Sequence, residues 1–176
     1  IKSVRHNFFA ADPSIAKQDL FIKNTQYLGD INIMCDLVMS VDEILTGVAL
    51  VNACPDTTFV INHCGMCPFN ADDLTKKFWR EGISQYAKQS NTICKISESG
   101  FLSRDKQWCV EEVTSIIKHC VDAFGEDRVV YASNWPVCEI TSTIEQWIEA
   151  IHESLKAHPS SVLEKLFYKN AEKYYL

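Results

Sequence analysis

A histidine and two cysteines with the spacing H-C-x-x-C stand where an apolar run of the sequence ends. His63, Cys64 and Cys67 follow the segment TTFVIN, which is rich in β-branched and aromatic residues. Imidazole and thiolate groups bind metals, a C-x-x-C pair can exchange disulfides, and a histidine at a strand end can serve an enzyme site. The residues elsewhere in the chain must decide among these three chemistries.

Polar residues also end four other apolar runs of the chain. They are Arg5, His6 and Asn7 in the first run, Asp36 in the second, Lys95 and Ser97 in the fourth, and Ser133 and Asn134 in the fifth, just before Trp135 and Pro136. The carboxyl ends of parallel strands meet at one edge of a sheet. We therefore expect one pocket there, built from Arg5, Asp36, His63, Lys95 or Ser97, and Asn134.

The elements that would position these residues are five strands alternating with helices. The apolar runs begin at Ile1, Ile31, Thr57, Asn91 and Arg128, and each is continuous, as in strands buried on both faces of a parallel sheet. Helical patterns cover residues 73–88, 106–124 and 143–157 and the tail of the chain. A further helix is expected after Ser40, which with Glu43 forms a capping-box pattern, and Gly125 is expected to cap the third helix. These features predict one α/β domain over residues 1–176.

Composition narrows the class of protein further. The chain has 176 residues, 47% of them hydrophobic and 23% charged, and a net charge of -6 without a run of basic residues. This balance argues against nucleic acid or a membrane as a partner. The start of the sequence has no signal-peptide pattern, and eight cysteines in a chain of this size favour reduced thiols, so we expect a cytoplasmic protein. Because the chain begins at Ile1 rather than methionine, we expect that it is part of a longer gene product or that it results from processing.

Three segments resemble one known family. SVRHN, VINHCG and RVVYASNWP occur in that order, followed by Asn170, Ala171 and Tyr174 in the pattern N-A-x-x-Y. Together they resemble the amidohydrolase-related (amidohydrolase 2) family, in the branch of fuconolactonases and 2-pyrone-4,6-dicarboxylate lactonase. The resemblance implies a (β/α)8 TIM barrel of the metal-dependent-hydrolase type, of which this chain supplies about the last five βα units. The five strands would correspond to the fourth through eighth, and a missing N-terminal segment or a second chain would complete the barrel.

The same resemblance implies a hydrolase that acts on a small carboxylic ester or a sugar-acid lactone, with water attacking the carbonyl. His63 and Asn134 would be catalytic, and Arg5, His6 and Trp135 would bind the small-molecule substrate. An arginine also suits a substrate carboxylate on chemical grounds. Side chains alternate along a strand, so only one of Arg5 and His6 should face the barrel interior.

Two departures from the family pattern bear on metal binding. The family's first-strand His-x-His pair has no counterpart in this chain, and Asn134 stands where relatives carry an aspartate. A neutral amide is a poor metal ligand, so we expect no metal ligands and no cofactor in this chain, although the family leaves zinc or manganese open.

Two alternative functions are compatible with the sequence. A relative that has lost catalytic power through Asn134 would be a binding protein. A thiol–disulfide module would use Cys64 and Cys67 in CGMC, but five evenly repeated strands do not suit that fold. A structural zinc site would need a second pair of ligands, and no second C-x-x-C exists in the sequence.

Overall fold

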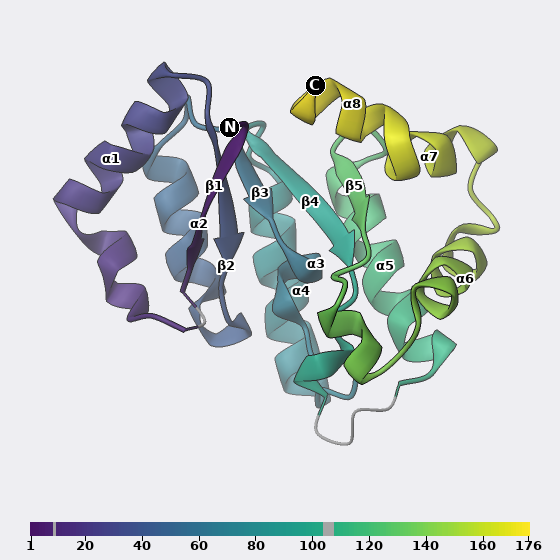
Figure 1. Ribbon diagram of the computed structural model, residues 1–176. Coiled ribbons are helices and arrows are strands. Elements are labelled where there is room, and N and C mark those ends of the chain that lie inside the picture. Colours follow the sequence, from purple (N-terminus) through teal and green to yellow (C-terminus); the bar gives the residue numbers. More distant parts are fainter. Residues whose placement is uncertain (9, 104–107) are drawn as a thin grey trace.

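The computed structural model describes residues 1–8, 10–103 and 108–176. Its five strands form one parallel sheet in chain order, as the apolar runs predict (Figure 1). The strands are β1 (Ser3–Asn7), β2 (Met34–Val38), β3 (Phe59–Ile61), β4 (Thr92–Ser97) and β5 (Val129–Ala132). Because all strands run the same way, their carboxyl ends lie along one edge of the sheet, where the polar residues were expected.

Helices follow every strand. The longer ones are α1 (Asp19–Asp30), α2 (Ile44–Ala53), α4 (Asp73–Ala87), α5 (Val110–Phe124) and α6 (Ile144–Leu155). The shorter segments are the 3₁₀ turns η1 (Pro13–Lys17), η2 (Val41–Glu43), η3 (Gly100–Leu102) and η4 (Val137–Ile140), then α3 (His63–Met66), α7 (Ser160–Glu164), the π-helical turn η5 (Lys165–Lys169) and α8 (Asn170–Tyr175). None of the described helices is long and apolar enough to cross a membrane.

The two faces of the sheet are covered differently. The main core lies between the sheet and the helices and contains Phe59, Trp79 and Trp147, which are fully buried. A smaller cluster on the opposite face joins Met34, Val60 and Ile93 to the two tyrosines at the end of α8. Figure 1 shows α8 beside the edge at which the strands begin, so the end at which they finish is left to the loops.

Local signals explain most helix boundaries. The Asp72 side chain accepts a hydrogen bond from the Thr75 amide and begins α4. Thr143 and Gln146 form a reciprocal capping box at α6, and Gly125, with φ of 74°, ends α5 as expected. The helix predicted over 106–124 begins at Val110, and residues 106 and 107 lie outside the described residues.

The capping box predicted at Ser40 is wrong. Residues Val41–Glu43 form a 3₁₀ turn, so α2 begins only at Ile44, and Ser40 makes no side-chain capping bond. Glu43 instead accepts a hydrogen bond from the Thr46 hydroxyl at 2.7 Å. Because α2 starts after this 3₁₀ turn, Glu43 is the N-cap residue of the helix. A capping box would require Glu43 at the third position of the helix.

Candidate active site at the carboxyl ends of the strands

Polar side chains from three strands and from Asn62, the residue after β3, are joined in one network on the face of the sheet opposite the helices. Arg5 Nη2 donates to Asn62 Oδ1 at 3.1 Å, and Asn62 Nδ2 donates to Asp36 Oδ1 at 2.9 Å. Lys95 Nζ forms an ion pair with the same Asp36 oxygen at 2.9 Å, and the Ser3 hydroxyl bonds the other oxygen. The network brings together three of the residues that the sequence placed at the site: Arg5, Asp36 and Lys95.

The charges of this network favour an anion. Burial would raise the pKa of Asp36, but the hydrogen bond from Ser3 and the charge of Lys95 hold that pKa below its usual value. The carboxylate is therefore ionised at neutral pH and neutralises one of the two cations. Arg5 is exposed, and its guanidinium supplies the remaining positive charge for a carboxylate or another anion.

His63 follows β3 by two residues and is 8% exposed. Its Nδ1 lies 2.9 Å from Ser97 Oγ, and the same oxygen accepts the His63 backbone N–H at 3.2 Å. When the Ser97 hydroxyl donates its own proton to Nδ1, the proton of the neutral imidazole is on Nε2. Burial, together with the positive charges of Arg5 and Lys95, lowers the pKa of His63 to about 4, so the ring is neutral at pH 7.

The backbone that carries His63 is a short left-handed turn. The four residues of α3, His63, Cys64, Gly65 and Met66, have φ values of 52°, 51°, 71° and 61°. The Gly65 amide donates to the Asn62 carbonyl at 2.9 Å, and Trp79 Nε1 donates to the Cys64 carbonyl at 2.7 Å. The turn leaves the imidazole beside Ser97 of β4.

Asn134 follows β5 in the same backbone region, with φ of 64°. Its amide Nδ2 donates to the Glu98 carbonyl at 2.9 Å. The same carbonyl is hydrogen-bonded to the imidazole of His63. This bond raises the His63 pKa and so partly offsets the lowering caused by burial. One backbone oxygen at the end of β4 therefore connects the two residues predicted to be catalytic.

Glu98 lies next to the candidate site and was not predicted from the sequence. It is fully buried, and Oε1 accepts hydrogen bonds from the Gly100 amide at 2.6 Å and the Thr141 hydroxyl at 2.8 Å. Burial raises its pKa, and among the described residues Oε2 has no hydrogen-bond partner. The carboxyl fastens the loop after β4 to the loop after β5. Its position directly after Ser97, at a strand end, is the signal that could have found it.

The structure places the other two predicted substrate residues away from the network. The His6 ring packs against Phe8 and Phe21, with centroid distances of 4.3 and 5.1 Å, on the helix side of β1. Alternation along the strand turns His6 away when Arg5 faces the network, so we correct its assignment to the site. Trp135 is 62% exposed, and its Nε1 donates to Glu139 Oε1 at 3.1 Å.

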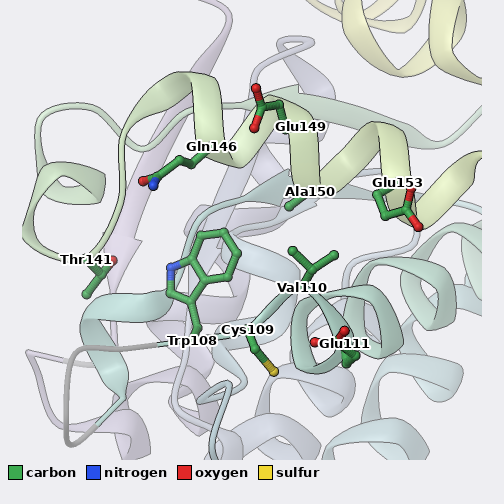
Figure 2. Close-up of a pocket in the computed structure, with 9 residues that line it drawn as sticks. All are labelled: Trp108, Cys109, Val110, Glu111, Thr141, Gln146, Glu149, Ala150 and Glu153. Carbon is green, nitrogen blue, oxygen red and sulfur yellow. The ribbon is translucent and has the colours of Figure 1, made fainter.

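A cavity of about 570 Å³ lies elsewhere, between α5 and α6 (Figure 2). Its walls are Trp108, Cys109, Val110, Glu111, Thr141, Gln146, Glu149, Ala150 and Glu153. Figure 2 shows glutamates on both helices and the Trp108 indole at one side. The cavity contains none of the predicted catalytic residues, and Thr141 connects it to Glu98. We place the candidate site on the sheet rather than in this cavity. The sheet carries a neutral imidazole and an amide that can take part in hydrolysis, beside cations that can bind an anion, whereas the carboxylates of the cavity are mostly solvated.

Two observations on the described residues bear on metal and thiol chemistry. They contain no group of three or more His, Cys, Asp or Glu side chains that could hold a metal ion. All eight cysteines are free, and Cys64 and Cys67 are buried. Burial also raises the pKa of Cys67 to about 12, which disfavours the thiolate that disulfide exchange requires.

Two lactonases are among the known proteins that this chain resembles in sequence. An L-fucono-1,5-lactonase of Burkholderia multivorans is 29% identical over an alignment of 108 residues, and the match covers 52% of this chain and 36% of that protein. An L-rhamnono-gamma-lactonase of Scheffersomyces stipitis is 28% identical over an alignment of 141 residues, and that match covers 69% of this chain and 41% of that protein. The chain thus matches less than half the length of these curated relatives.

The fold is that of a known barrel class. A crystal structure of a Burkholderia multivorans amidohydrolase with bound zinc superposes with a TM-score of 0.93 at 16% identity, covering 99% of this chain and 64% of that one. The five βα units are accordingly part of a TIM barrel, as predicted. The family model described as amidohydrolase matches residues 4–176. The chain belongs to this amidohydrolase (amidohydrolase 2) family.

Proposed function

We propose that the protein hydrolyses a small lactone or related carboxylic ester, with a sugar-acid lactone as the substrate class. The observation that carries the proposal is the buried, neutral His63 beside Ser97, close to the cationic Arg5 and Lys95. A neutral imidazole can donate a hydrogen bond to a carbonyl oxygen as negative charge develops on it. The two lactonases among the relatives point to the same reaction class.

The reaction needs only water as a second reactant. Water adds to the carbonyl carbon, the ring C–O bond breaks, and the products are a hydroxycarboxylate and one proton. In the proposal, His63 stabilises the oxyanion, Asn134 orients the attacking water, and Arg5 holds an oxygen of the substrate. Asp36 keeps Lys95 and Asn62 in place through the bonds described above.

The proposal assigns these roles to side chains alone. The described residues do not assemble a metal site, while one structural relative was crystallised with zinc. We propose that the five strands correspond to the fourth through eighth of the barrel, and that a further segment or a second chain supplies the first three. The shares of the relatives that the chain covers support this assignment. We also propose a cytoplasmic location, which the free cysteines favour.

The experiment is a panel of sugar-acid lactones, including L-fucono-1,5-lactone and L-rhamnono-1,4-lactone, with proton release measured in the full protein. Arg5→Gln should raise KM for a lactone by about tenfold, the usual worth of one charged hydrogen bond. Lys23→Gln removes the same charge from the exposed surface of α1 and should leave KM unchanged. If no lactone or ester is hydrolysed but carboxylated ligands bind through Arg5, the protein is a binding module and the proposal is wrong.

A further inference from the structure

The turn that carries His63 adopts a conformation that its residues do not prefer. Three of its four residues are not glycine, yet His63, Cys64 and Met66 all have φ between 51° and 61°. Steric contact between Cβ and the backbone disfavours this region for L-residues, and consecutive residues there are rarer still. Such a turn persists only where surrounding groups hold it.

Trp79 is one of the groups that hold the turn. The Cys64 residue is fully buried, and its carbonyl accepts the indole N–H of Trp79 at 2.7 Å. A buried carbonyl needs a hydrogen-bond partner, and a turn that relaxed to ordinary φ values would redirect this one. The indole bond therefore favours the left-handed conformation over the relaxed one.

The position of the indole is itself fixed by close packing. Trp79 lies on α4 and is fully buried, and its ring tilts against His119 with the centroids 5.2 Å apart. Gly65 permits the approach of α4, because a Cβ there would lie 2.5 Å from Ile83 Cδ1 and 3.3 Å from Trp79 Nε1. The donor is thus held rigidly against the turn.

We propose that Trp79 is a positioning residue: its indole N–H fixes the left-handed turn, and the turn aims the His63 imidazole at Ser97 and the polar network. The role of His63 in hydrolysis rests on the proposed function, but the placement of its ring does not. Trp147 provides a matched control, because it is also fully buried and its Nε1 donates to a backbone carbonyl, that of Ala132, at 3.2 Å.

The experiment follows the His63 Cε1–H resonance through a pH titration of the full protein, with the signal assigned by its loss in His63→Asn. Trp79→Phe keeps most of the ring and loses the donor. As the turn relaxes, the imidazole becomes more exposed and moves away from Arg5 and Lys95, so its pKa should rise from about 4 by about one unit or more. Hydrolysis should lose about 10–100-fold in kcat, with KM changed less than about threefold. Trp147→Phe should lose comparable stability and leave the His63 titration as it is.

Trp79→His separates the donor from the bulk of the ring, because a histidine Nε2–H can occupy the place of the indole N–H. This variant should be less stable than the native protein yet keep the low His63 titration. If Trp79→Phe does not fold, this arm decides the matter, and a shifted His63 titration in Trp79→His would refute the proposal. The proposal is equally wrong if Trp79→Phe folds and titrates like the native protein. A shifted titration in a protein that hydrolyses no lactone would support the positioning role and refute only the proposed function.

Discussion

The ends of β3 and β5 share a backbone feature but differ in how deeply their side chains are buried. Each carries a predicted catalytic residue at positive φ, His63 at 52° and Asn134 at 64°, and each lies near a backbone carbonyl bonded by a buried tryptophan. His63 sits in a run of four such residues and is 8% exposed, whereas Asn134 is a single such residue and only half-buried.

Because of this difference in burial, the chemistry of the two strand ends is controlled by different properties. At β3 the surroundings determine the chemistry of the side chain, because burial and two neighbouring cations keep the imidazole neutral. At β5 the side chain itself determines the chemistry, because asparagine readily adopts positive φ and its amide carries no titratable proton. A change at β3 should therefore act through the environment and through proton affinity, and a change at β5 through the identity of the side chain.

The largest expected effect is at β3. His63→Ala should lower lactone hydrolysis by about 10²–10⁴-fold, because it removes the donor that stabilises the oxyanion. Initial rates of the folded variant, checked by circular dichroism, provide the measurement. His152→Ala removes an exposed imidazole on α6 and should retain the native rate. An unchanged rate in His63→Ala would remove the functional distinction between the two strand ends.

The second effect is a pH dependence of stability that β3 has and β5 lacks. The pKa of His63 is about 4 when folded and near 6.5 when exposed, so both states are neutral above pH 6.5. As the pH falls from 6.5 to 4, the unfolded chain binds the proton first, and up to about 3 kcal/mol of stability is lost. Urea unfolding at several pH values should show this slope in the native protein and a flatter slope in His63→Gln. Asn134→Ala should keep the native slope, and equal slopes in the native protein and His63→Gln would contradict the assignment.

The third effect tests the side chain at β5. Asn134→Asp should raise hydrolysis by about 10²-fold, because it places a carboxylate general base where the sequence has an amide. Aspartate tolerates positive φ, and the half-buried position lets the new carboxylate turn from the Glu98 carbonyl toward solvent. Rates should be compared with and without added zinc or manganese. If Asn134→Asp lowers the rate and the native protein is active, the amide of Asn134 is the group that takes part in hydrolysis.

The sequence predicts the sheet better than it predicts the site. Continuous apolar runs identified all five strands. This signal is expected for β2, β3 and β4, which are buried, while β1 at the edge of the sheet is largely exposed despite its run. Helix α1 gave no such signal, since Thr25 is its one buried residue among those described. The start of α2 was also misplaced, because a 3₁₀ turn depends on tertiary packing as well as on Ser40 and Glu43.

At the site, strand-end logic found the charged residues and missed their connections. Arg5, Asp36 and Lys95 lie in one network, although they stand within their strands rather than at the last residues. The residue that joins them is Asn62, a neutral amide directly before His63 in VINHCG. The left-handed conformation of the turn at His63 could not be predicted from the sequence either. Gly65 hints at positive φ, but the conformation of its neighbours depends on the Trp79 bond from a helix that follows in the chain.

The smallest expected effect concerns Trp135, whose environment is the reverse of that of Trp79. Trp79 is fully buried and bonds the backbone, while Trp135 is 62% exposed and bonds the side chain of Glu139. Trp135→Ala should therefore change the free energy of unfolding by less than about 0.5 kcal/mol, as surface substitutions do. An exposed indole directly after Asn134 can still pack its apolar face against the C–H groups of a bound sugar-acid ring, and burial of one such group contributes about 0.8 kcal/mol.

Trp135→Ala should accordingly raise KM for the lactone by about threefold to tenfold and leave kcat within about twofold. Val137→Ala truncates another exposed apolar residue of the same loop and serves as the control, with no expected change in KM. The measurement is a pair of saturation curves at pH 7, taken alongside urea unfolding. A loss of stability without a change in KM would mean that Trp135 packs rather than binds. The β5 end would then hold the substrate through Asn134 alone, and the contrast between an environment-controlled β3 and a side-chain-controlled β5 would rest on that single amide.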